Sequence, residues 1–270
     1  MLADGTRLAC AGHSIRVLAP SGLLSFVAGS NTRRGNQDGP GAEARFDIPS
    51  GIMVDPAGNV VAVDTDNHAL RLVSKAARSA RVKGAGFADG QGAAARFFLP
   101  ASVVVTATGD YVMTDCSNHA VRVVTPGGAV RTLAGNRERG FVEGQGAAAR
   151  FNCPIGLAVD VGDSIRVTDY GNHAVRRVTM AGAVSTVAGN GQQGYADGEG
   201  AAARFNRPSA VVVDKEGTIV VADGDNHRLR RMTGRHVRAA PRRARPTGRG
   251  LSRASPSPGS WRWTSAGACS

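Results

Sequence analysis

Asp64-Thr65-Asp66-Asn67-His68-Ala69-Leu70-Arg71 is one copy of an Asp-x-x-Asn-His-x-x-Arg motif that recurs through the chain. Further copies begin at Asp115, Asp169 and Asp223, and a degenerate copy without the Asp and Asn is Gly12-His13-Ser14-Ile15-Arg16. The steps from His to His are 55, 51, 54 and 54 residues. A fixed period of this length indicates a repeat architecture, in which each repeat is one small supersecondary unit.

A second motif, Ala-Arg-Phe-x-x-Pro, keeps the same period. Its copies are residues 44–49, 95–100, 149–154 and 203–208, each preceded by a Gly-rich segment. A Val/Leu-Ala-Gly triplet precedes this Gly-rich segment in most repeats. In the second repeat it becomes Val82-Lys83-Gly84 and the following loop is three residues shorter, which accounts for the single 51-residue step.

Between the motifs, the sequence is typical of short β-strands. Apolar runs at 210–213 and 218–222 are separated by a polar turn, and residues 228–232 partly alternate between apolar and polar. A fourth run, residues 183–188 in the preceding repeat, completes the unit. A four-stranded sheet this small cannot bury both faces alone, so neighbouring sheets must stack around an axis. The sequence therefore predicts an all-β fold, a β-propeller of four-stranded antiparallel blades.

The number of blades follows from the count of strands. Three strands are expected before residue 30, twelve in the three complete repeats and three in the last repeat. Eighteen strands correspond to about 4.5–5 blades. We therefore expect an incomplete or open propeller, whose exposed edges could pair with another chain.

The order of these features resembles the NHL repeat, a family named for its Asn-His-Leu signature. The shared pattern is Pro, an apolar strand, Asp and Gly, a Val-rich strand, Asp and then Asn-His-x-x-Arg. The resemblance is strongest over residues 46–233 and weak over residues 5–29, and the Gly-rich insert is similar to that of long-repeat members. It implies a β-propeller that acts as a protein-binding scaffold. Some propellers of the family bind RNA, and some relatives of the class are metal-dependent lyases or lactonases.

The polar residues of the repeated motif are predicted to be a structural turn, one per blade. We expect the Asp to accept backbone N–H groups of the turn that follows it and the Asn to occupy a positive-φ position. We also expect the His to bond within the same turn and the Arg to reach back to the carboxylate. The motif residues are Asp64, Asn67, His68, Arg71, Asp115, Asn118, His119, Arg122, Asp169, Asn172, His173, Arg176, Asp223, Asn226, His227 and Arg230.

A metal or catalytic site is the alternative interpretation of the same residues. Equivalent turns on different blades should lie far apart, and one turn offers only two ligands, too few for a closed zinc site. The strands expected at the axis, residues 52–54, 103–105, 157–159 and 211–213, are almost wholly apolar. We therefore predict no catalytic residue, no bound metal and no cofactor.

The Gly-rich segments and the phenylalanines after them are predicted to be structural as well. Asp89, Glu143 and Asp197 supply too few oxygens for the six to eight that calcium takes. Burial of each Phe is worth about 1.5–3 kcal/mol. The residues predicted to plug the seams between blades are Phe46, Phe97, Phe151 and Phe205.

The four cysteines, Cys10, Cys116, Cys153 and Cys269, show no metal-ligand spacing. We expect free thiols, which mildly favours an intracellular setting. No apolar run approaches the roughly 18 residues that a membrane span needs, and residues 1–8 do not resemble a signal peptide. The sequence assigns no compartment.

The formal net charge of +12 is concentrated at the C-terminal end. Residues 234–270 hold eight Arg and no acidic residue, leaving 25 basic and 21 acidic residues elsewhere. We predict a propeller over residues 1–238 and a disordered tail rich in Arg, Pro, Ser and Gly over residues 239–270.

The function expected is a non-enzymatic protein-interaction scaffold with an unidentified protein partner. The alternatives are an RNA-binding face, suggested by Arg176-Arg177 and Arg230-Arg231, and a metal-dependent lyase or lactonase.

Overall fold

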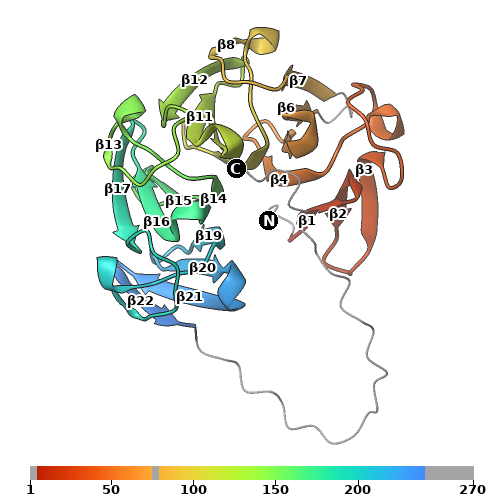
Figure 1. Cartoon of the computed structure of the whole chain (residues 1–270). Helices are drawn as coiled ribbons and strands as arrows, with labels where there is room; N and C mark the ends of the chain where they lie inside the picture. The colour runs from red at the N-terminus through yellow and green to blue at the C-terminus, as the bar shows by residue number, and fades with distance from the viewer. Residues whose placement is uncertain (1–4, 75–78, 241–270) are drawn as a thin grey trace, which may run out of the picture. The chain divides into compact units, whose positions relative to one another are not determined.

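The computed structural model describes residues 5–74 and 79–240, which form five antiparallel sheets, here called blades 1 to 5 (Figure 1). Blade 1 comprises β1 (Arg7–Ala11), β2 (His13–Leu18) and β3 (Leu24–Ser30). Blade 2 comprises β4 (Pro49–Val54), β5 (Val60–Asp64), β6 (Ala69–Val73) and β7 (Ser79–Lys83). Blade 3 comprises β8 (Gly90–Gln91), β9 (Pro100–Val105), β10 (Tyr111–Asp115), β11 (Ala120–Val124) and β12 (Ala129–Ala134). Blade 4 comprises β13 (Gly144–Gln145), β14 (Pro154–Val159), β15 (Ile165–Asp169), β16 (Ala174–Val178) and β17 (Ala183–Ala188). Blade 5 comprises β18 (Gly198–Glu199), β19 (Pro208–Val213), β20 (Ile219–Asp223), β21 (Arg228–Thr233) and β22 (His236–Ala239).

Eight single-turn 3₁₀ helices connect the strands. Four of them end the Gly-rich segments, namely η1 (Gly41–Glu43), η3 (Gly92–Ala94), η5 (Gly146–Ala148) and η7 (Gly200–Ala202). The other four hold the Asp-x-x-Asn-His motif, namely η2 (Thr65–Asn67), η4 (Cys116–Asn118), η6 (Tyr170–Asn172) and η8 (Gly224–Asn226). None of these described helices is long and apolar enough to cross a membrane.

Blades 3 and 4 contain one strand more than the four that the sequence predicts, and blade 5 contains five strands where the sequence predicts three. In blade 3 the strand order is β8-β12-β11-β10-β9, so the Gly-rich segment adds a short outer strand to the sheet. Gly90 and Gln91 pair with Val130 and Ala129 of β12. The periodicity analysis missed this strand because two residues are too few to show an apolar alternation.

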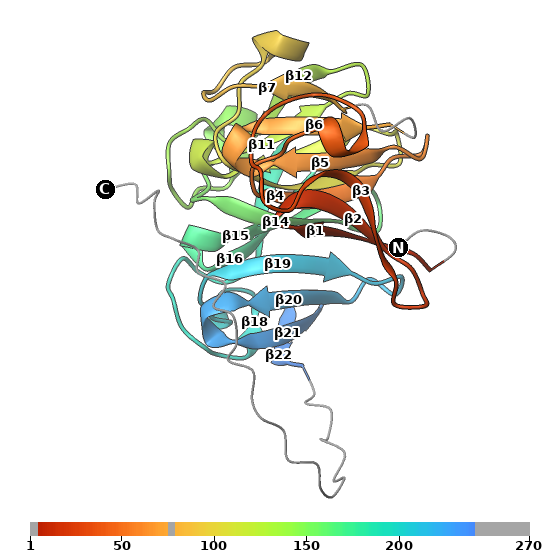
Figure 2. The same cartoon turned by 90° about the vertical axis from the view of Figure 1, so that its right-hand side faces the viewer.

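The first long strand of each repeat lies innermost, and the innermost strands contact one another in the order β4, β9, β14, β19 (Figures 1 and 2). Glycine makes this approach close. A Cβ at Gly51 would lie 2.8 Å from the Cα of Ser102, and a Cβ at Gly156 would lie 2.8 Å from the Cα of Ala210. Neither distance is tolerable for a real side chain.

The apolar core lies in the seams between blades. At the seam of blades 3 and 4, the fully buried Phe151 packs in one cluster with Val104 and Val121 of blade 3 and Ile165 and Val167 of blade 4. Phe46, Phe97 and Phe205 lie in the corresponding clusters of the other three seams. Each blade is therefore held mainly by the side chains that it shares with its neighbours.

The five sheets form an open arc, as the strand count predicts (Figure 1). Within residues 5–74 and 79–240, blade 1 has no strand on the axial side of β1, whereas each of blades 2 to 5 has an innermost strand of its own. At the other end of the arc, β22 continues to Ala239, one residue past the predicted boundary at 238. The rest of the predicted disordered tail lies outside the described residues, except Ala240.

Candidate functional site

The repeated motif is a buried ion pair with two further donors. In blade 3 the Nη1 of Arg122 donates to Oδ2 of Asp115 over 2.7 Å, and both side chains are fully buried. Asn118 donates from Nδ2 to the same oxygen at 2.9 Å, and the backbone N–H of Phe98 donates to Oδ1 at 2.7 Å. The carboxylate thus has three protein donors, which is how a buried charge is normally stabilised. Its backbone donor precedes β9 and does not belong to the turn that follows the Asp, so that expectation was wrong.

The same geometry recurs in blades 2, 4 and 5. The Arg–Asp distance is 2.8 Å between Arg71 and Asp64, 2.9 Å between Arg176 and Asp169, and 3.0 Å between Arg230 and Asp223. The remaining Asn residues, Asn67, Asn172 and Asn226, each donate to their own Asp and to a carbonyl of the Gly-rich segment.

Each Arg also holds two backbone segments. Arg122 donates to the carbonyl of Arg96 at 3.1 Å and to that of Ala88 at 2.8 Å, while its Nη2 bonds to the Asp89 carboxylate at 2.7 Å. The motif therefore fixes the Gly-rich segment and the Ala-Arg-Phe segment to the blade. Structural bonds occupy Nη1 and Nη2 of Arg122 and both carboxylate oxygens of Asp115, whereas the buried Nε of Arg122 has no hydrogen-bond partner among the described residues.

The buried Arg is stacked between two aromatic rings in three blades. The guanidinium of Arg122 lies 4.6 Å from the ring centroid of Phe87 and 5.2 Å from that of Phe97. The equivalent outer rings are Phe141 over Arg176, at 4.7 Å, and Tyr195 over Arg230, also at 4.7 Å. Such stacks are worth about 0.5–2 kcal/mol.

Sequence reasoning missed these outer rings. The signal that could have revealed them is an aromatic residue directly after a Gly in three successive inserts, at Phe87, Phe141 and Tyr195. In blade 2 the corresponding position is Asn36, and Arg71 stacks on Phe46 at 4.6 Å.

Burial raises the pKa of the motif carboxylates. For Asp169, desolvation raises the pKa to about 6, although Arg176, Asn172 and the N–H of Asn152 act in the opposite direction. Burial also raises the pKa of Asp64 and Asp115 above its ordinary value. The bonds from Arg176, Asn172 and the N–H of Asn152 stabilise the ionised form of the Asp169 carboxylate, which pairs with the guanidinium.

The positive-φ position of the turn is the His, not the Asn that the sequence analysis favoured. The φ angles are 53° at His68, 52° at His119, 51° at His173 and 53° at His227. The Asn lies one residue earlier, inside the 3₁₀ turn, where its side chain can reach the Asp. The His follows that turn, and its N–H closes it on the carbonyl three residues back, as in Thr65 and His68.

The His side chain bonds to the next blade and not within its own turn, so this expectation was also wrong. Nδ1 of His119 accepts the backbone N–H of Cys153 at 3.0 Å. The corresponding bonds, each from a backbone N–H, join Leu99 to His68 at 3.2 Å, Arg207 to His173 at 3.1 Å and Ile48 to His13 at 3.3 Å. The repeated histidine is therefore a link between blades.

Three of the motif histidines have lowered pKa values. Burial is the largest cause for His68, His119 and His173, and the charge of Arg139 adds to it at His119. The neutral ring is the form that fits, because Nδ1 must carry a lone pair to accept the N–H of the next blade.

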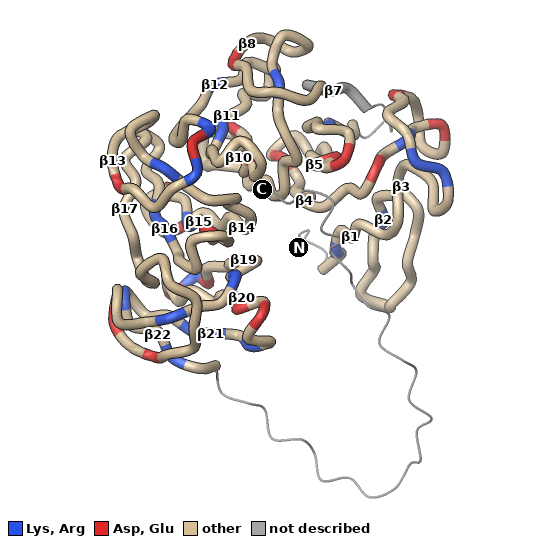
Figure 3. Tube along the Cα trace, in the orientation of Figure 1, with Lys and Arg blue, Asp and Glu red and all other residues tan. Residues whose placement is uncertain are grey.

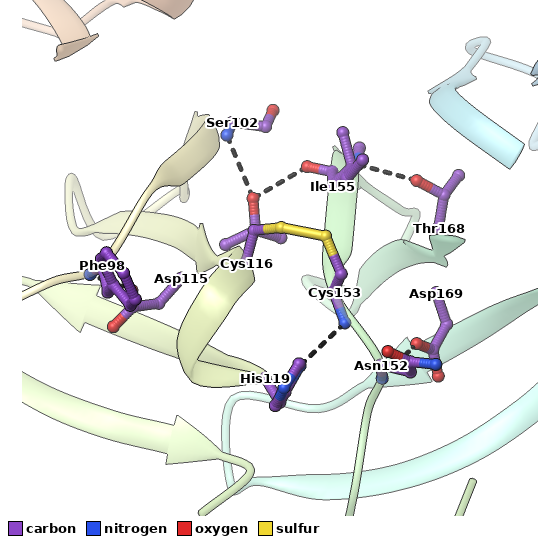
Figure 4. The surroundings of a disulfide bond; sticks show 12 residues. Phe98, Ser102, Asp115, Cys116, His119, Asn152, Cys153, Ile155, Thr168 and Asp169 are labelled. Atoms are coloured by element: carbon purple, nitrogen blue, oxygen red, sulfur yellow. Dashed lines mark hydrogen bonds between the residues drawn. A yellow bond between two sulfur atoms is a disulfide. The ribbon is translucent and has the colours of Figure 1, made fainter. Parts of the chain in front are cut away.

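Cys116 and Cys153 form a disulfide, so the prediction that they are free thiols was wrong (Figure 4). Cys116 is the first residue of η4 in blade 3, and Cys153 directly precedes β14 of blade 4. Spacing in the sequence did not indicate this pairing, because the two residues meet only when neighbouring blades pack. Cys10 remains a free thiol, and burial raises its pKa to about 12. Cys269 lies outside the described residues, and the argument from free thiols for an intracellular setting loses its basis.

The acidic residues of the Gly-rich segments also have partners in their own blades. Asp89 accepts from Arg122 and from the N–H of Thr132, Glu143 accepts from the N–H of Thr186, and Asp197 accepts from Arg230. Across residues 5–74 and 79–240, no group of three or more His, Cys, Asp or Glu side chains is placed to hold a metal ion.

Large apolar side chains are exposed at the end of the propeller that carries the motif turns. Their exposed fractions are 52% for Ile48, 41% for Phe98, 37% for Phe141 and 46% for Tyr195. Phe98 packs edge-on against His68, with ring centroids 5.2 Å apart, so it lies beside a motif turn. We call these four residues the turn-end surface.

Comparison with known proteins agrees with this architecture. The family model described as NHL repeat matches residues 151–177 and 205–232. The chain contains NHL repeats. Over 173 residues the chain is 25% identical to Protein SUPPRESSOR OF QUENCHING 1, chloroplastic, of Arabidopsis thaliana, and over 112 residues it is 33% identical to NHL repeat-containing protein 2 of Gallus gallus. These matches cover 59% and 41% of this chain but only 16% and 15% of the two relatives.

The similar solved structures include enzymes and a binding protein. An inactive virginiamycin B lyase of Staphylococcus aureus with quinupristin aligns with a TM-score of 0.59 at 12% identity, over 88% of this chain and 67% of that one. An auxiliary nutrient binding protein of Bacteroides thetaiotaomicron gives 0.61 at 18% identity, over 83% and 64%. A putative gluconolactonase gives 0.55 at 15% identity, over 88% and 79%. At these identities the likeness shows the propeller fold alone, a fold that serves both catalysis and binding.

Proposed function

We propose that the chain is a protein-interaction scaffold that binds a partner protein through the turn-end surface. The observation that carries the proposal is the exposure of Ile48, Phe98, Phe141 and Tyr195 at one end of the blades. Aromatic residues are enriched among the anchors of protein interfaces, where they contribute much of the binding energy.

The rigidity of this surface supports the proposal. Phe141 and Tyr195 are held by their stacks on the buried Arg176 and Arg230, and Phe98 is held by its contact with His68. An anchor that is already ordered loses little conformational entropy on binding, which favours affinity.

Capture experiments with the full-length chain test the proposal. The double variant Phe141→Ser/Tyr195→Ser is expected to retain at least about tenfold less of any specifically captured protein than the unchanged chain, because two anchors of about 1 kcal/mol or more are lost. The matched control is Val161→Ser, since Val161 is 71% exposed in the turn at the other end of blade 4. Circular dichroism verifies that all variants are folded. Equal retention by the double variant and the control would contradict the proposal.

A metal-dependent lyase or lactonase is the second candidate, because proteins with those names are among the structural neighbours. Such an enzyme needs ligands that converge on one ion. Stoichiometric, tightly bound metal in the purified protein, measured by elemental analysis, would favour this candidate over the scaffold.

An RNA-binding face is the third candidate. Figure 3 shows basic and acidic residues interspersed over all five blades, without a stripe of a single sign. RNA binding would require an affinity that falls steeply with salt and survives removal of residues 239–270, because that segment carries much of the basic charge.

A further inference from the structure

The outward face of blade 5 exposes side chains whose equivalents in blades 3 and 4 are buried. Val212 and Leu229 are 60% and 57% exposed. The equivalent residues of blade 4 are Ala158, four residues after its Pro, and Val175, six residues after its motif Asp. Ala158 and Val175 are only 8% and 0% exposed, because blade 5 covers them.

The strand pairing confirms that this is one continuous face. Val212 pairs with Val220, and Ala222 pairs with Leu229, so these four side chains project from the same side of the sheet. Val211 lies on the opposite side, where it is buried in the seam with blade 4.

The residues that cover the equivalent face of blade 4 indicate which kind of segment the exposed face of blade 5 would bind. Ala158 and Val175 share their cluster with Phe205, the plug of the next repeat. Two residues beyond Phe205, the backbone N–H of Arg207 bonds to His173. Each seam therefore combines a buried Phe with a backbone N–H, two residues later, that reaches the histidine of the preceding blade.

Blade 5 has the histidine that would accept such a backbone N–H. His227 has the same φ as the other motif histidines and is exposed. The other four histidines accept a backbone N–H of the next blade, but Nδ1 of His227 has no donor among residues 5–74 and 79–240. The apolar face and the histidine acceptor are thus both unpartnered at the same edge.

We propose that this face binds a partner polypeptide that presents a phenylalanine and, two residues later, a free backbone N–H on a residue of positive φ, as Phe205 and Arg207 do in the seam of blades 4 and 5. The geometry continues that of the four seams already formed within the chain. A second copy of the chain does not fit as the occupant, because its Phe46, Phe97, Phe151 and Phe205 are fully buried in its own seams. The proposal uses none of the four residues of the turn-end surface, so its failure would leave the proposed scaffold function intact.

The probe that tests the proposal is a fluorescent synthetic peptide with the sequence of residues 195–213, which contains Phe205 and the N–H of residue 207. We expect saturable binding to the full-length protein by fluorescence anisotropy. Two matched peptides, one with Phe205→Ser and one N-methylated at residue 207, are each expected to bind at least about tenfold more weakly, since each lacks one of the two groups.

Protein variants locate the binding face. Val212→Asp and Leu229→Asp are expected to weaken peptide binding at least about tenfold, whereas Val161→Asp, at an exposed turn of blade 4, should leave it unchanged. All three positions are mostly exposed, so the variants should fold.

Three outcomes would overturn the proposal. The first is no binding, or equal binding of all three peptides. The second is a concentration-dependent dimer, measured by light scattering, that Val212→Asp abolishes and Val161→Asp retains, because a second copy would then cover the face. The third is a peptide affinity that rises on removal of residues 241–270, because that segment would then be the occupant.

Discussion

Replacing Arg122 by Met removes the cation of a fully buried ion pair while keeping much of the side-chain volume. The change leaves the Asp115 carboxylate with its two remaining donors, Asn118 and the N–H of Phe98, but without a compensating charge. It also leaves the carbonyl of Ala88 without the Arg donor.

The expected loss follows from these contacts. Removing one partner of a buried ion pair destabilises a protein by about 3–5 kcal/mol, because the other charge stays buried and uncompensated. The lost stacks on Phe87 and Phe97 add to the loss. We therefore expect the unfolding free energy of Arg122→Met to fall by at least about 3 kcal/mol.

Urea unfolding followed by circular dichroism measures this loss, and blade 1 supplies the control. Arg16 occupies the same position of the degenerate motif, but no Asp of the described residues pairs with it and its Nη2 bonds to the side chain of Asn31. Arg16→Met should cost less than about 1 kcal/mol. Adding Asp115→Asn to Arg122→Met should restore part of the loss, since the uncompensated charge is removed. A loss for Arg122→Met no larger than that for Arg16→Met would refute the reasoning.

Three further predictions concern the seams between blades. Burial lowers the pKa of His119 in the folded state, so the free energy of unfolding should fall as the pH falls through the unfolded-state pKa of about 6.5. In chemical denaturation between about pH 7.5 and 5.5, His119→Gln should lose less of this free energy than the unchanged chain. Cys116→Ser should lower the unfolding free energy by up to about 4 kcal/mol, which is the chain-entropy value for a 37-residue separation. A reducing agent should destabilise the unchanged chain to the same extent and leave the stability of the variant unchanged. Gly156→Ala should cost about 1–3 kcal/mol in thermal unfolding, because its Cβ would meet Ala210, whereas Gly127→Ala, with only one atom within 4 Å, should be close to neutral.

Much of the fold was predictable because the motifs that specify it recur several times in the sequence. A period near 54 residues, strands between polar turns and a count near eighteen strands predict an open propeller, and the structure has that architecture. The pairing of Arg122 with Asp115 could be anticipated because both residues belong to one short motif on adjacent strands.

Contacts between repeats could not be predicted in the same way. The bond from Cys153 to His119 and the Cys116–Cys153 disulfide join segments more than thirty residues apart, and the packing of two blades brings them together. A single motif gives no information on which atoms of the next repeat lie opposite it. The exposure of Val212 and Leu229 could not be predicted either, because their sequence context matches that of buried residues.

Hydrogen exchange of the full-length chain, with and without its captured partner, tests the scaffold account most directly. The account predicts that the partner protects the segments at the turn end, residues 96–99, 140–143 and 194–197, which hold Phe98, Phe141 and Tyr195. Protection confined to the turns at the other end, residues 160–164 and 179–182, would contradict it.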